Sequence, residues 1–335
     1  MTVALHVDGG VGVGLGHAMR GIGLASALRE IGLNPVFFVS EASDLRPILE
    51  PFKVRVETCD PTPAGLVSVC SKHQADVLIV DSYRLTEAHL RELSQGVRSI
   101  ICFDDKADRV LDVALVVNGA PSAGKLDYRV GTSTVLLLGT PYQIVRPEFI
   151  EPVEKHYHRE PRSILVTVGG DDVLNIMGDL LAMFEELLAQ RWSQVTVNFV
   201  VGPYFDTARP PRDPRCVIHR APRDIRRLMC EADLCLSAGG QTLYELARCG
   251  TPTIAFCVGD DQVPNLEAFS DYQGIMYVGW AKQTGWLDRV LHKLERLLSS
   301  GQRRALLGRR ASELIDGQGA RRVAARIQEL ITAQA

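Results

Sequence analysis

Short apolar runs, most of them followed at once by glycine or a polar residue, constrain the fold of this chain more than any other feature. The first half contains five of them: "TVALHV", "PVFFVS", "ADVLIVD", "RSIICFDD" and "VALVVN". Uninterrupted apolar runs of this length are typical of strands that are buried on both faces of a parallel sheet. Helical patterns lie between them, the first over residues 17–31, and this alternation predicts an α/β architecture.

The same pattern begins again in the second half, with "SILVTVGGDDVLN", "QVTVNFVVG", "RCVIHR", "ADLCLSAGG" and "PTIAFCV". Residues 146–162, "RPEFIEPVEKHYHREPR", separate the halves with three prolines, many charges and no clear periodicity, which is typical of a domain boundary. A chain of 335 residues is long enough for two separate cores. We therefore expect two Rossmann-like domains, 1–152 and 161–318, followed by an amphipathic helix over 319–335.

Composition and charge narrow the class of partner. The formal net charge of −3 gives no sign of a nucleic-acid-binding surface. We expect neither a signal peptide nor a membrane span, because no charged segment leads into a long apolar stretch and no apolar run reaches roughly 18 residues. A cytoplasmic location is the resulting expectation. The eight cysteines include no C-x-x-C pair, so the sequence indicates neither a zinc site nor a redox motif.

Patterns that could bind a metal ion are weak. His156 and His158 lie in the polar boundary stretch, where a solvated linker is the simpler interpretation. Acidic pairs could hold a divalent ion, although such residues more often form turns or cap helices. The three acidic pairs are Asp104–Asp105, Asp171–Asp172 and Asp260–Asp261. We therefore expect no metal site.

The ends of the strands are the natural place for a ligand. In doubly wound sheets, ligands bind outside the carboxyl ends of the strands. Two such domains facing each other would enclose a cleft, and the residues at the strand ends would line it. The strand-end candidates are Asp8, Asp81, Asp104, Gly169 and Gly239.

The first glycine loop, "VDGGVGVGLGHAMR", matches neither the dinucleotide pattern G-x-G-x-x-G nor the phosphate loop with its Lys-Ser/Thr. It forms a backbone turn that brings His17 to the start of a helix. The helix dipole disfavours an imidazolium there, so we expect a neutral imidazole that can accept a proton. The alternative is that His17 only caps the helix or packs locally.

The second glycine loop lies in "SAGGQTLYELARCGTP", residues 237–252. Two glycines end a strand, and Gln241 and Thr242 open a helix whose first backbone amides would suit a diphosphate. One turn further, Glu245 could accept hydrogen bonds from a ribose diol. The alternative is an ordinary helix start followed by a surface glutamate.

Together these motifs resemble a known group. "SAGGQTLYELARCGTP" and the later "DDQ" resemble the donor-nucleotide motif of two-domain GT-B glycosyltransferases such as the murein lipid N-acetylglucosaminyltransferase. "VDGGVGVGLGHAMR", "VDSYRL", "FDD", "PYQIVRPEF", "LVTVGGDD" and "IDGQGARRVA" resemble, in the same order, the UDP-sugar hydrolase family of pseudaminic acid biosynthesis and its spore-coat polysaccharide relatives. The resemblance spans almost the whole chain and implies a GT-B fold, with UDP held mainly by the second domain.

The resemblance also implies roles for particular residues. His17, in the G-H-x-x-R motif, is the catalytic residue. The implied substrate-binding residues are Asp8, Gly16, Arg20, Asp81, Tyr83, Asp261 and Gln262. The implied nucleotide-binding residues are Gly169, Gly170, Ile225, Gly239, Gly240, Gln241, Thr242 and Glu245. Asp261 replaces the asparagine of the usual N-Q pair near the sugar, so the resemblance does not fix which sugar binds.

The sequence thus leads to a first hypothesis, a UDP-sugar hydrolase that cleaves the anomeric C–O bond, with His17 as general base on water. The implied substrate is a UDP-2,4-diacetamido-2,4,6-trideoxy-hexose, and we expect no cofactor beyond the UDP of the substrate. A metal-independent glycosyltransferase with a small-molecule or glycan acceptor is the second hypothesis, and a non-catalytic nucleotide-sugar-binding protein is the third. The sequence does not indicate the oligomeric state.

Overall fold

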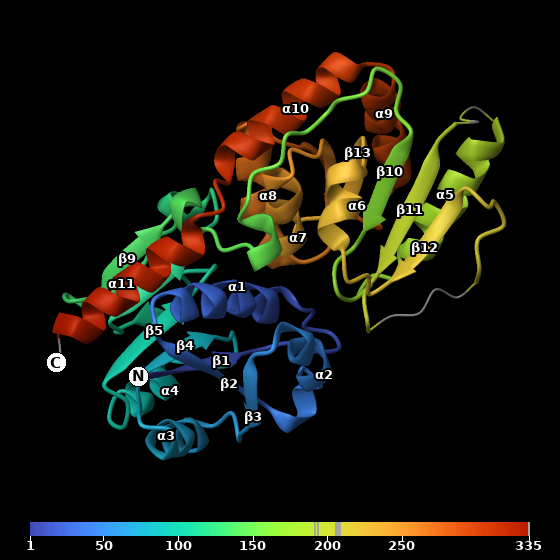
Figure 1. Ribbon diagram of the computed structural model, residues 1–335. Helices are drawn as coiled ribbons and strands as arrows, with labels where there is room; N and C mark the ends of the chain where they lie inside the picture. The colour runs from blue at the N-terminus through green and yellow to red at the C-terminus, as the bar shows by residue number, and fades with distance from the viewer. Residues whose placement is uncertain (191, 193, 205–208, 334–335) are drawn as a thin grey trace. The chain divides into compact units, whose positions relative to one another are not determined.

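Two parallel sheets organise the chain. The computed structural model describes residues 1–190, 192, 194–204 and 209–333. The chain divides into two units, which Figure 1 shows in blue-to-green and in green-to-red tones respectively, with the red terminal helix in the first. Unit 1 comprises Met1–Pro147 and Gly317–Ala335, and unit 2 comprises Glu148–Asp316. The chain passes from unit 1 to unit 2 after Pro147, which lies within the proline-rich stretch 146–162.

The sheet of unit 1 has seven parallel strands in the order β3-β2-β1-β4-β5-β7-β9. Their bounds are Thr2–Val7 for β1, Asn34–Val39 for β2, Arg55–Thr58 for β3, Ala75–Asp81 for β4, Ser99–Phe103 for β5, Leu115–Asn118 for β7 and Val135–Leu138 for β9. A separate two-stranded sheet pairs β6 (Val110–Leu111) with β8 (Arg129–Val130). Because β1 lies between β2 and β4, the chain direction across the sheet reverses beside β1, as in a Rossmann fold.

Helices cover both faces of this sheet. The helices of unit 1 are α1 (Gly16–Glu30), α2 (Arg46–Leu49), α3 (Pro63–Lys72), α4 (Glu87–Leu93) and α11 (Gly319–Ala333). Val3 and Leu5 pack in a cluster with α1 and α11, whereas Ala4 packs in a second cluster with α3 and α4. Alternate residues of β1 therefore face opposite helical layers. This explains why the strand reads as a continuous apolar run.

The sheet of unit 2 has six parallel strands in the order β12-β11-β10-β13-β14-β15. Their bounds are Ser163–Thr167 for β10, Thr196–Val201 for β11, Cys216–Arg220 for β12, Leu234–Ala238 for β13, Thr253–Cys257 for β14 and Met276–Trp280 for β15. The helices are α5 (Met177–Gln190), α6 (Ile225–Glu231), α7 (Gln241–Arg248), α8 (Val263–Asp271), α9 (Trp286–Leu298) and α10 (Gly301–Leu314).

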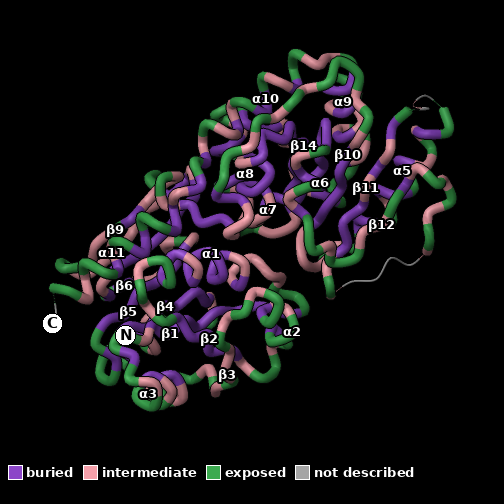
Figure 2. The backbone as a smooth tube through the Cα atoms, in the orientation of Figure 1, coloured by how far each residue is buried: buried purple, intermediate pink, exposed green. Residues whose placement is uncertain are grey.

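Figure 2 shows the central strands of both sheets as buried. The described part of the chain also contains six short 3-10 helices: Glu41–Ser43, Glu50–Phe52, Ala123–Lys125, Thr140–Tyr142, Pro147–Phe149 and Asp260–Gln262.

The predicted α/β architecture with two Rossmann-like domains is confirmed. The helix expected at the end of the chain is α11, and its buried residues pack against α1 of unit 1. Within the described residues, no helix combines the length and the hydropathy that a membrane crossing requires.

Candidate active site

The strand order of unit 1 brings three aspartates to one edge. β1, β4 and β5 are neighbours in the sheet, so the residues at their carboxyl ends, Asp8, Asp81 and Asp104, lie close together. The backbone N–H of Asp8 donates to the carbonyl of Asp81 at 3.1 Å, and the hydroxyl of Ser82 donates to Oδ2 of Asp8 at 2.7 Å. This edge lies beside β1, where a ligand site is expected in a Rossmann fold.

The glycine loop after β1 is a tight turn. Gly10, Gly12 and Gly14 all have positive φ, and Gly10 and Gly14 exchange two backbone hydrogen bonds. Residues with side chains are disfavoured at such φ values, which accounts for the repeated glycines. The turn leads into α1 at Gly16, and Leu15, at the N-cap position, provides no side-chain cap. His17 therefore does not serve as the helix cap.

His17 is held by Asp81. Nδ1 of the imidazole lies 2.6 Å from Oδ1 of Asp81, and the ring of Tyr83 stands edge-on to the imidazole with centroids 4.9 Å apart. An ionised carboxylate only accepts hydrogen bonds, so the neutral imidazole carries its proton on Nδ1. Nε2 then has a lone pair and no hydrogen-bond partner among the described residues. This nitrogen is the one placed to accept a proton.

Arg20, one helical turn after His17, fixes Asp81 from the other side. Its Nε and Nη2 donate to the two oxygens of Asp81 at 2.9 and 2.8 Å, while Nη1 and Nη2 donate to Asp105 at 3.0 Å each. The guanidinium thus bridges two carboxylates in forked geometry. Nη2 also approaches Nδ1 of His17 at 3.5 Å. Both groups donate to the same oxygen, so this approach is a contact and not a hydrogen bond.

The charges around His17 determine the direction of its pKa shift. Burial lowers the pKa of His17, but the charge and hydrogen bond of Asp81 raise it, and the net pKa lies above the ordinary value of 6.5. The carboxylate at 2.6 Å therefore outweighs the helix dipole, which alone would lower this pKa. Burial raises the pKa of Asp81, but the charges of Arg20 and His17 lower it to a net value well below its usual range.

Asp105 completes a cluster with His17, Arg20, Asp81 and Tyr83, called the His17 cluster below. The sequence did not single out Asp105 as a site residue. Its Oδ2 accepts from the hydroxyl of Tyr83 at 3.0 Å as well as from Arg20. Burial, followed by the charge of Asp105, raises the pKa of Tyr83, so this hydroxyl stays protonated and donates. Asp104, the strand-end candidate, instead closes a turn: its Oδ1 accepts from the backbone N–H of Lys106 and Ala107 at 3.1 and 2.7 Å.

In unit 2 the two glycine loops follow neighbouring strands, β10 and β13. Gly169 has φ of +98°, and a Cβ built on Gly202 would lie 2.2 Å from the carbonyl oxygen of Gly170. After β13, Gly240 occupies the N-cap position of α7 and provides no side-chain cap. The backbone N–H groups of the first turn, at Gln241 and Thr242, therefore form a helix start suited to an anion.

The side chain of Gln262 holds the glycine loop that follows β13. Its Oε1 accepts from the backbone N–H of Gly239 and of Val258, both at 3.2 Å, and so joins the ends of β13 and β14. Nδ2 of Asn265 donates to the carbonyl of Gly239 at 3.3 Å. The carbonyl oxygen of Gln262 is thus used within the protein, whereas its amide nitrogen has no hydrogen-bond partner among the described residues.

The remaining predicted residues occupy varied positions. Glu245 is only 2% exposed, so the alternative of a surface glutamate is wrong. Ile225 is the buried first residue of α6, and Gly16 is the first residue of α1. Asp261 lies exposed in a 3-10 turn.

The predicted polar pairs have structural partners. Asp172 caps the start of α5 by accepting from the backbone N–H of Ile176 and Met177 at 2.9 and 2.8 Å. Nδ1 of His158 lies 2.7 Å from Oδ1 of Asp233. A search of the described residues finds no group of three or more potential metal ligands.

Sequence comparison finds distant relatives, and no family model matches the chain. The spore coat polysaccharide biosynthesis protein SpsG of Bacillus subtilis is 24% identical over 98% of both chains. The uncharacterized protein MJ1062 of Methanocaldococcus jannaschii is 25% identical over 81% of this chain, which spans only 58% of that protein. The pseudaminic acid cytidylyltransferase and UDP-2,4-diacetamido-2,4,6-trideoxy-beta-L-altropyranose hydrolase of Helicobacter pylori is 24% identical over 58% of this chain and 36% of its own length.

Structural comparison identifies the fold. MurG of Acinetobacter baumannii superimposes with a TM-score of 0.63 at 16% identity, over 98% of this chain and 99% of that one. MnaA of Staphylococcus aureus, solved with UDP, gives a TM-score of 0.67 at 12% identity over 99% and 97%. Spinosyn rhamnosyltransferase SpnG gives 0.64 at 14% identity over 97% and 100%. The fold of this chain is therefore GT-B, as the sequence predicted.

Proposed function

We propose that this protein is a nucleotide-sugar hydrolase, which cleaves the anomeric C–O bond of a UDP-linked amino sugar to give the free sugar and UDP. The observation that carries the proposal is the state of His17. Its Nδ1 is fixed by Asp81 at 2.6 Å, and its Nε2 has no partner among the described residues. The name of the Helicobacter relative, which includes a UDP-sugar hydrolase, supports a substrate of the UDP-2,4-diacetamido-2,4,6-trideoxy-hexose type.

The proposed reaction uses the two units differently. In unit 2, the helix start at Gly240–Thr242 binds the diphosphate through backbone N–H groups, and Glu245 binds the ribose. In unit 1, Nε2 of His17 accepts a proton from water as the water oxygen forms a bond to the anomeric carbon. The bond between that carbon and the UDP oxygen breaks, and its electron pair leaves with the diphosphate, which the amides stabilise.

Asp81 and Arg20 act in this reaction by holding His17. Asp81 keeps the proton on Nδ1 and stabilises the imidazolium that forms, as a carboxylate does behind a catalytic histidine. Arg20 keeps Asp81 ionised and fixes its plane. Asp261 and the amide of Gln262 are the proposed contacts for the sugar. The proposed reaction requires no metal ion and no cofactor besides the UDP of the substrate.

A glycosyltransferase is the second candidate. The same histidine could take its proton from an acceptor hydroxyl instead of water, and several proteins with this fold are named as glycosyltransferases. The two candidates share the donor and the base and differ only in the nucleophile.

The test is product analysis with a panel of UDP-amino sugars in H2¹⁸O, without and with candidate acceptors. Hydrolysis predicts free sugar and UDP without an acceptor, with no ¹⁸O in the UDP. Strict dependence on an acceptor would establish transfer, and ¹⁸O in the UDP would contradict C–O cleavage.

The variant His17→Gln should lose turnover but bind UDP normally. His73→Gln is the matched control, because His73 also pairs with a carboxylate, that of Glu57 at 2.7 Å, away from this cluster. Near wild-type turnover in His17→Gln would refute the assignment of the base. UDP binding without turnover of any UDP-sugar would favour a binding protein.

A further inference from the structure

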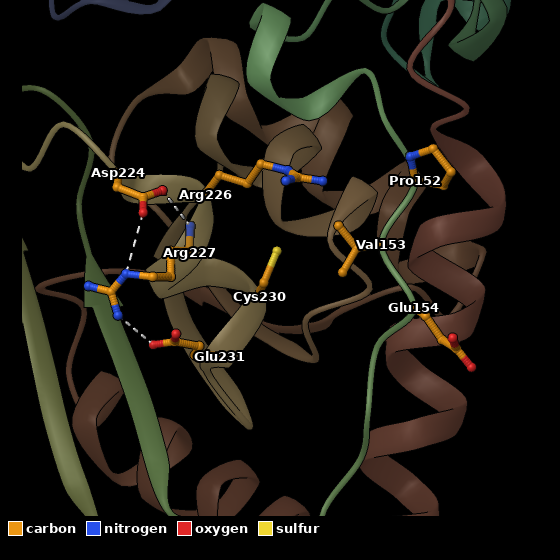
Figure 3. A pocket seen from close by; sticks show the side chains of 8 residues that line it. All are labelled: Pro152, Val153, Glu154, Asp224, Arg226, Arg227, Cys230 and Glu231. Atoms are coloured by element: carbon orange, nitrogen blue, oxygen red, sulfur yellow. Dashed lines mark hydrogen bonds and ion pairs between the residues drawn. The ribbon is translucent and has the colours of Figure 1, made fainter.

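A second reactive group lies in unit 2. A pocket of about 500 Å³ is lined by Pro152–Glu154 and by residues of helix α6. Figure 3 shows the sulfur of Cys230 pointing into the space between Arg226 and Val153. None of the residues proposed above to bind the nucleotide sugar lines this pocket.

Cys230 does not stand alone. Its Sγ lies 3.5 Å from Sγ of Cys249, the residue that directly follows α7. Cys249 is 1% exposed, whereas Cys230 is half-buried and reaches the pocket. A disulfide needs an S–S distance of about 2.05 Å, so the two sulfurs must approach by roughly 1.5 Å. Side-chain rotation with a small shift of the helix ends can supply this.

The surroundings favour the thiolate of Cys230. The hydrogen bond between the two sulfurs lowers the pKa of Cys230 most, and despite burial the nearby Arg226 and Lys155 help to bring it to about 7. Nζ of Lys155 donates to the carbonyls of Cys230 and Ala232, the latter at 2.6 Å, and so places its charge at the end of α6. The pKa of Cys249 is raised. The pair thus combines an accessible nucleophile with a protonated thiol behind it.

We propose that Cys230 and Cys249 form a reversible disulfide when the protein meets a hydroperoxide, and that this bond weakens nucleotide binding. In the first step the Cys230 thiolate attacks one oxygen of hydrogen peroxide. An S–O bond forms, the O–O bond breaks, and the leaving hydroxide takes a proton to become water. In the second step the Cys249 sulfur attacks the sulfenic sulfur of Cys230, the S–S bond forms, and the S–O bond breaks with loss of water.

The effect on nucleotide binding rests on the proposed function. Cys249 ends the helix whose first residues form the proposed diphosphate site, and α7 is only eight residues long. A cross-link that pulls one end of so short a helix displaces the other end as well. Backbone N–H groups must meet phosphate oxygens within a few tenths of an ångström, so the displacement lowers affinity.

Peptide mapping tests the chemistry. Trypsin cleaves after Arg227 and Arg248, which puts Cys230 and Cys249 on different peptides. After treatment of the folded protein with hydrogen peroxide, we expect these two peptides linked through Cys230 and Cys249, and separated again by dithiothreitol. Cys59→Ala is the matched control: Cys59 is also half-buried, but burial raises its pKa to about 11, so the link should form unchanged. In Cys249→Ala, Cys230 should stop at the sulfenic acid and react with dimedone.

Treated wild-type protein that keeps its circular dichroism yet shows no linked peptide would overturn the proposal, whether Cys230 stays a thiol or becomes a sulfinic acid. For the second half, calorimetric titration with UDP should show affinity lower by about fivefold or more in the oxidised protein. Affinity within twofold in fully linked protein would refute that half. If the reduced protein binds no UDP, that half fails together with the proposed nucleotide site, while the mapping still decides the thiol chemistry.

Discussion

The variant Asp81→Asn tests the centre of the proposed mechanism. Asparagine keeps the shape of the side chain but removes the charge that faces His17 at 2.6 Å and Arg20 at 2.8 and 2.9 Å. Burial and the charge of Arg20 both lower the pKa of His17. In the variant they act without the charge of Asp81, which is the largest influence that raises this pKa. The pKa of His17 should move from above 6.5 in the wild type to below 6.5 in the variant.

Two effects on activity follow. In the wild type the base is active only when His17 is unprotonated, so the rate should rise with pH through a pKa above 6.5. In Asp81→Asn the rising limb moves to lower pH, but the maximum falls by about 10³- to 10⁴-fold, because the asparagine amide can donate to Nδ1 and leave the proton on Nε2.

The substitution Asp81→Asn should also lower the stability of the folded protein. Asp81 is 3% exposed in its side chain, and removing one partner of a buried ion pair costs about 3 kcal/mol when a second carboxylate, here Asp105, remains. The folded-state pKa of Asp81 is depressed, so its contribution is complete above its unfolded pKa of about 4 and is lost as pH falls through the folded value. The difference in stability between wild type and variant should therefore be full at pH 7 and shrink in acid.

Histidine-selective NMR titration measures the pKa directly and needs no substrate. His17→Gln assigns the resonance among the eight histidines, and urea unfolding at pH 7 and pH 3 measures stability. A wild-type pKa for His17 below 6.5, or an unchanged pKa in Asp81→Asn, would show that Asp81 does not control the imidazole. Full activity in Asp81→Asn would show that the pair plays no part in the reaction.

Other contacts in the two units lead to three further expectations. Arg20→Lys keeps the charge but cannot bridge two carboxylates in forked geometry, so kcat should fall roughly 10- to 100-fold in a UDP-release assay. Gln262→Leu removes the acceptor shared by two backbone N–H groups, and UDP affinity measured by calorimetry should fall about tenfold. Gly202→Ala places a Cβ 2.2 Å from the carbonyl of Gly170 and should lower both the unfolding midpoint and UDP affinity, whereas Gly178→Ala, with open space at its Cβ, should lower neither.

The central strands were predictable because burial on both faces leaves an uninterrupted apolar run. "TVALHV" corresponds to β1 and "ADVLIVD" to β4, residue for residue. β3, β9 and β15 were not predicted, and all three lie at an edge of their sheet. β3 is nowhere fully buried, and β15 is buried at one position only. In β3 and β15 the continuous buried apolar pattern that marks the central strands is therefore missing.

Some residues of the His17 cluster were easier to predict from the sequence than others. His17 and Arg20 are one helical turn apart, and Asp81 ends an apolar run, so each stood out locally. Asp105 did not, because it follows an equivalent aspartate. Only the fold shows that Asp104 turns into the backbone of Lys106 and Ala107 while Asp105 faces Arg20. The direction of the pKa shift of His17 was not predictable for the same reason: a helix start is visible in the sequence, but a carboxylate 64 residues away is not.

The two units present different chemistry at the same topological position. In each sheet the first strand of the unit lies beside the fourth, β1 beside β4 and β10 beside β13, so the loops that follow these strands meet. In unit 1 the start of α1 and the end of β4 supply titratable side chains, His17 and Asp81, which can move or stabilise a proton. In unit 2 the loops supply glycines, whose backbone N–H groups can approach an anion closely. Backbone N–H groups can bind a phosphate at any pH near neutrality because they do not titrate. Activation of a nucleophile instead needs a group that titrates near neutrality. One topology therefore supports both halves of the proposed reaction, and the residue types at the strand ends decide which half each unit performs.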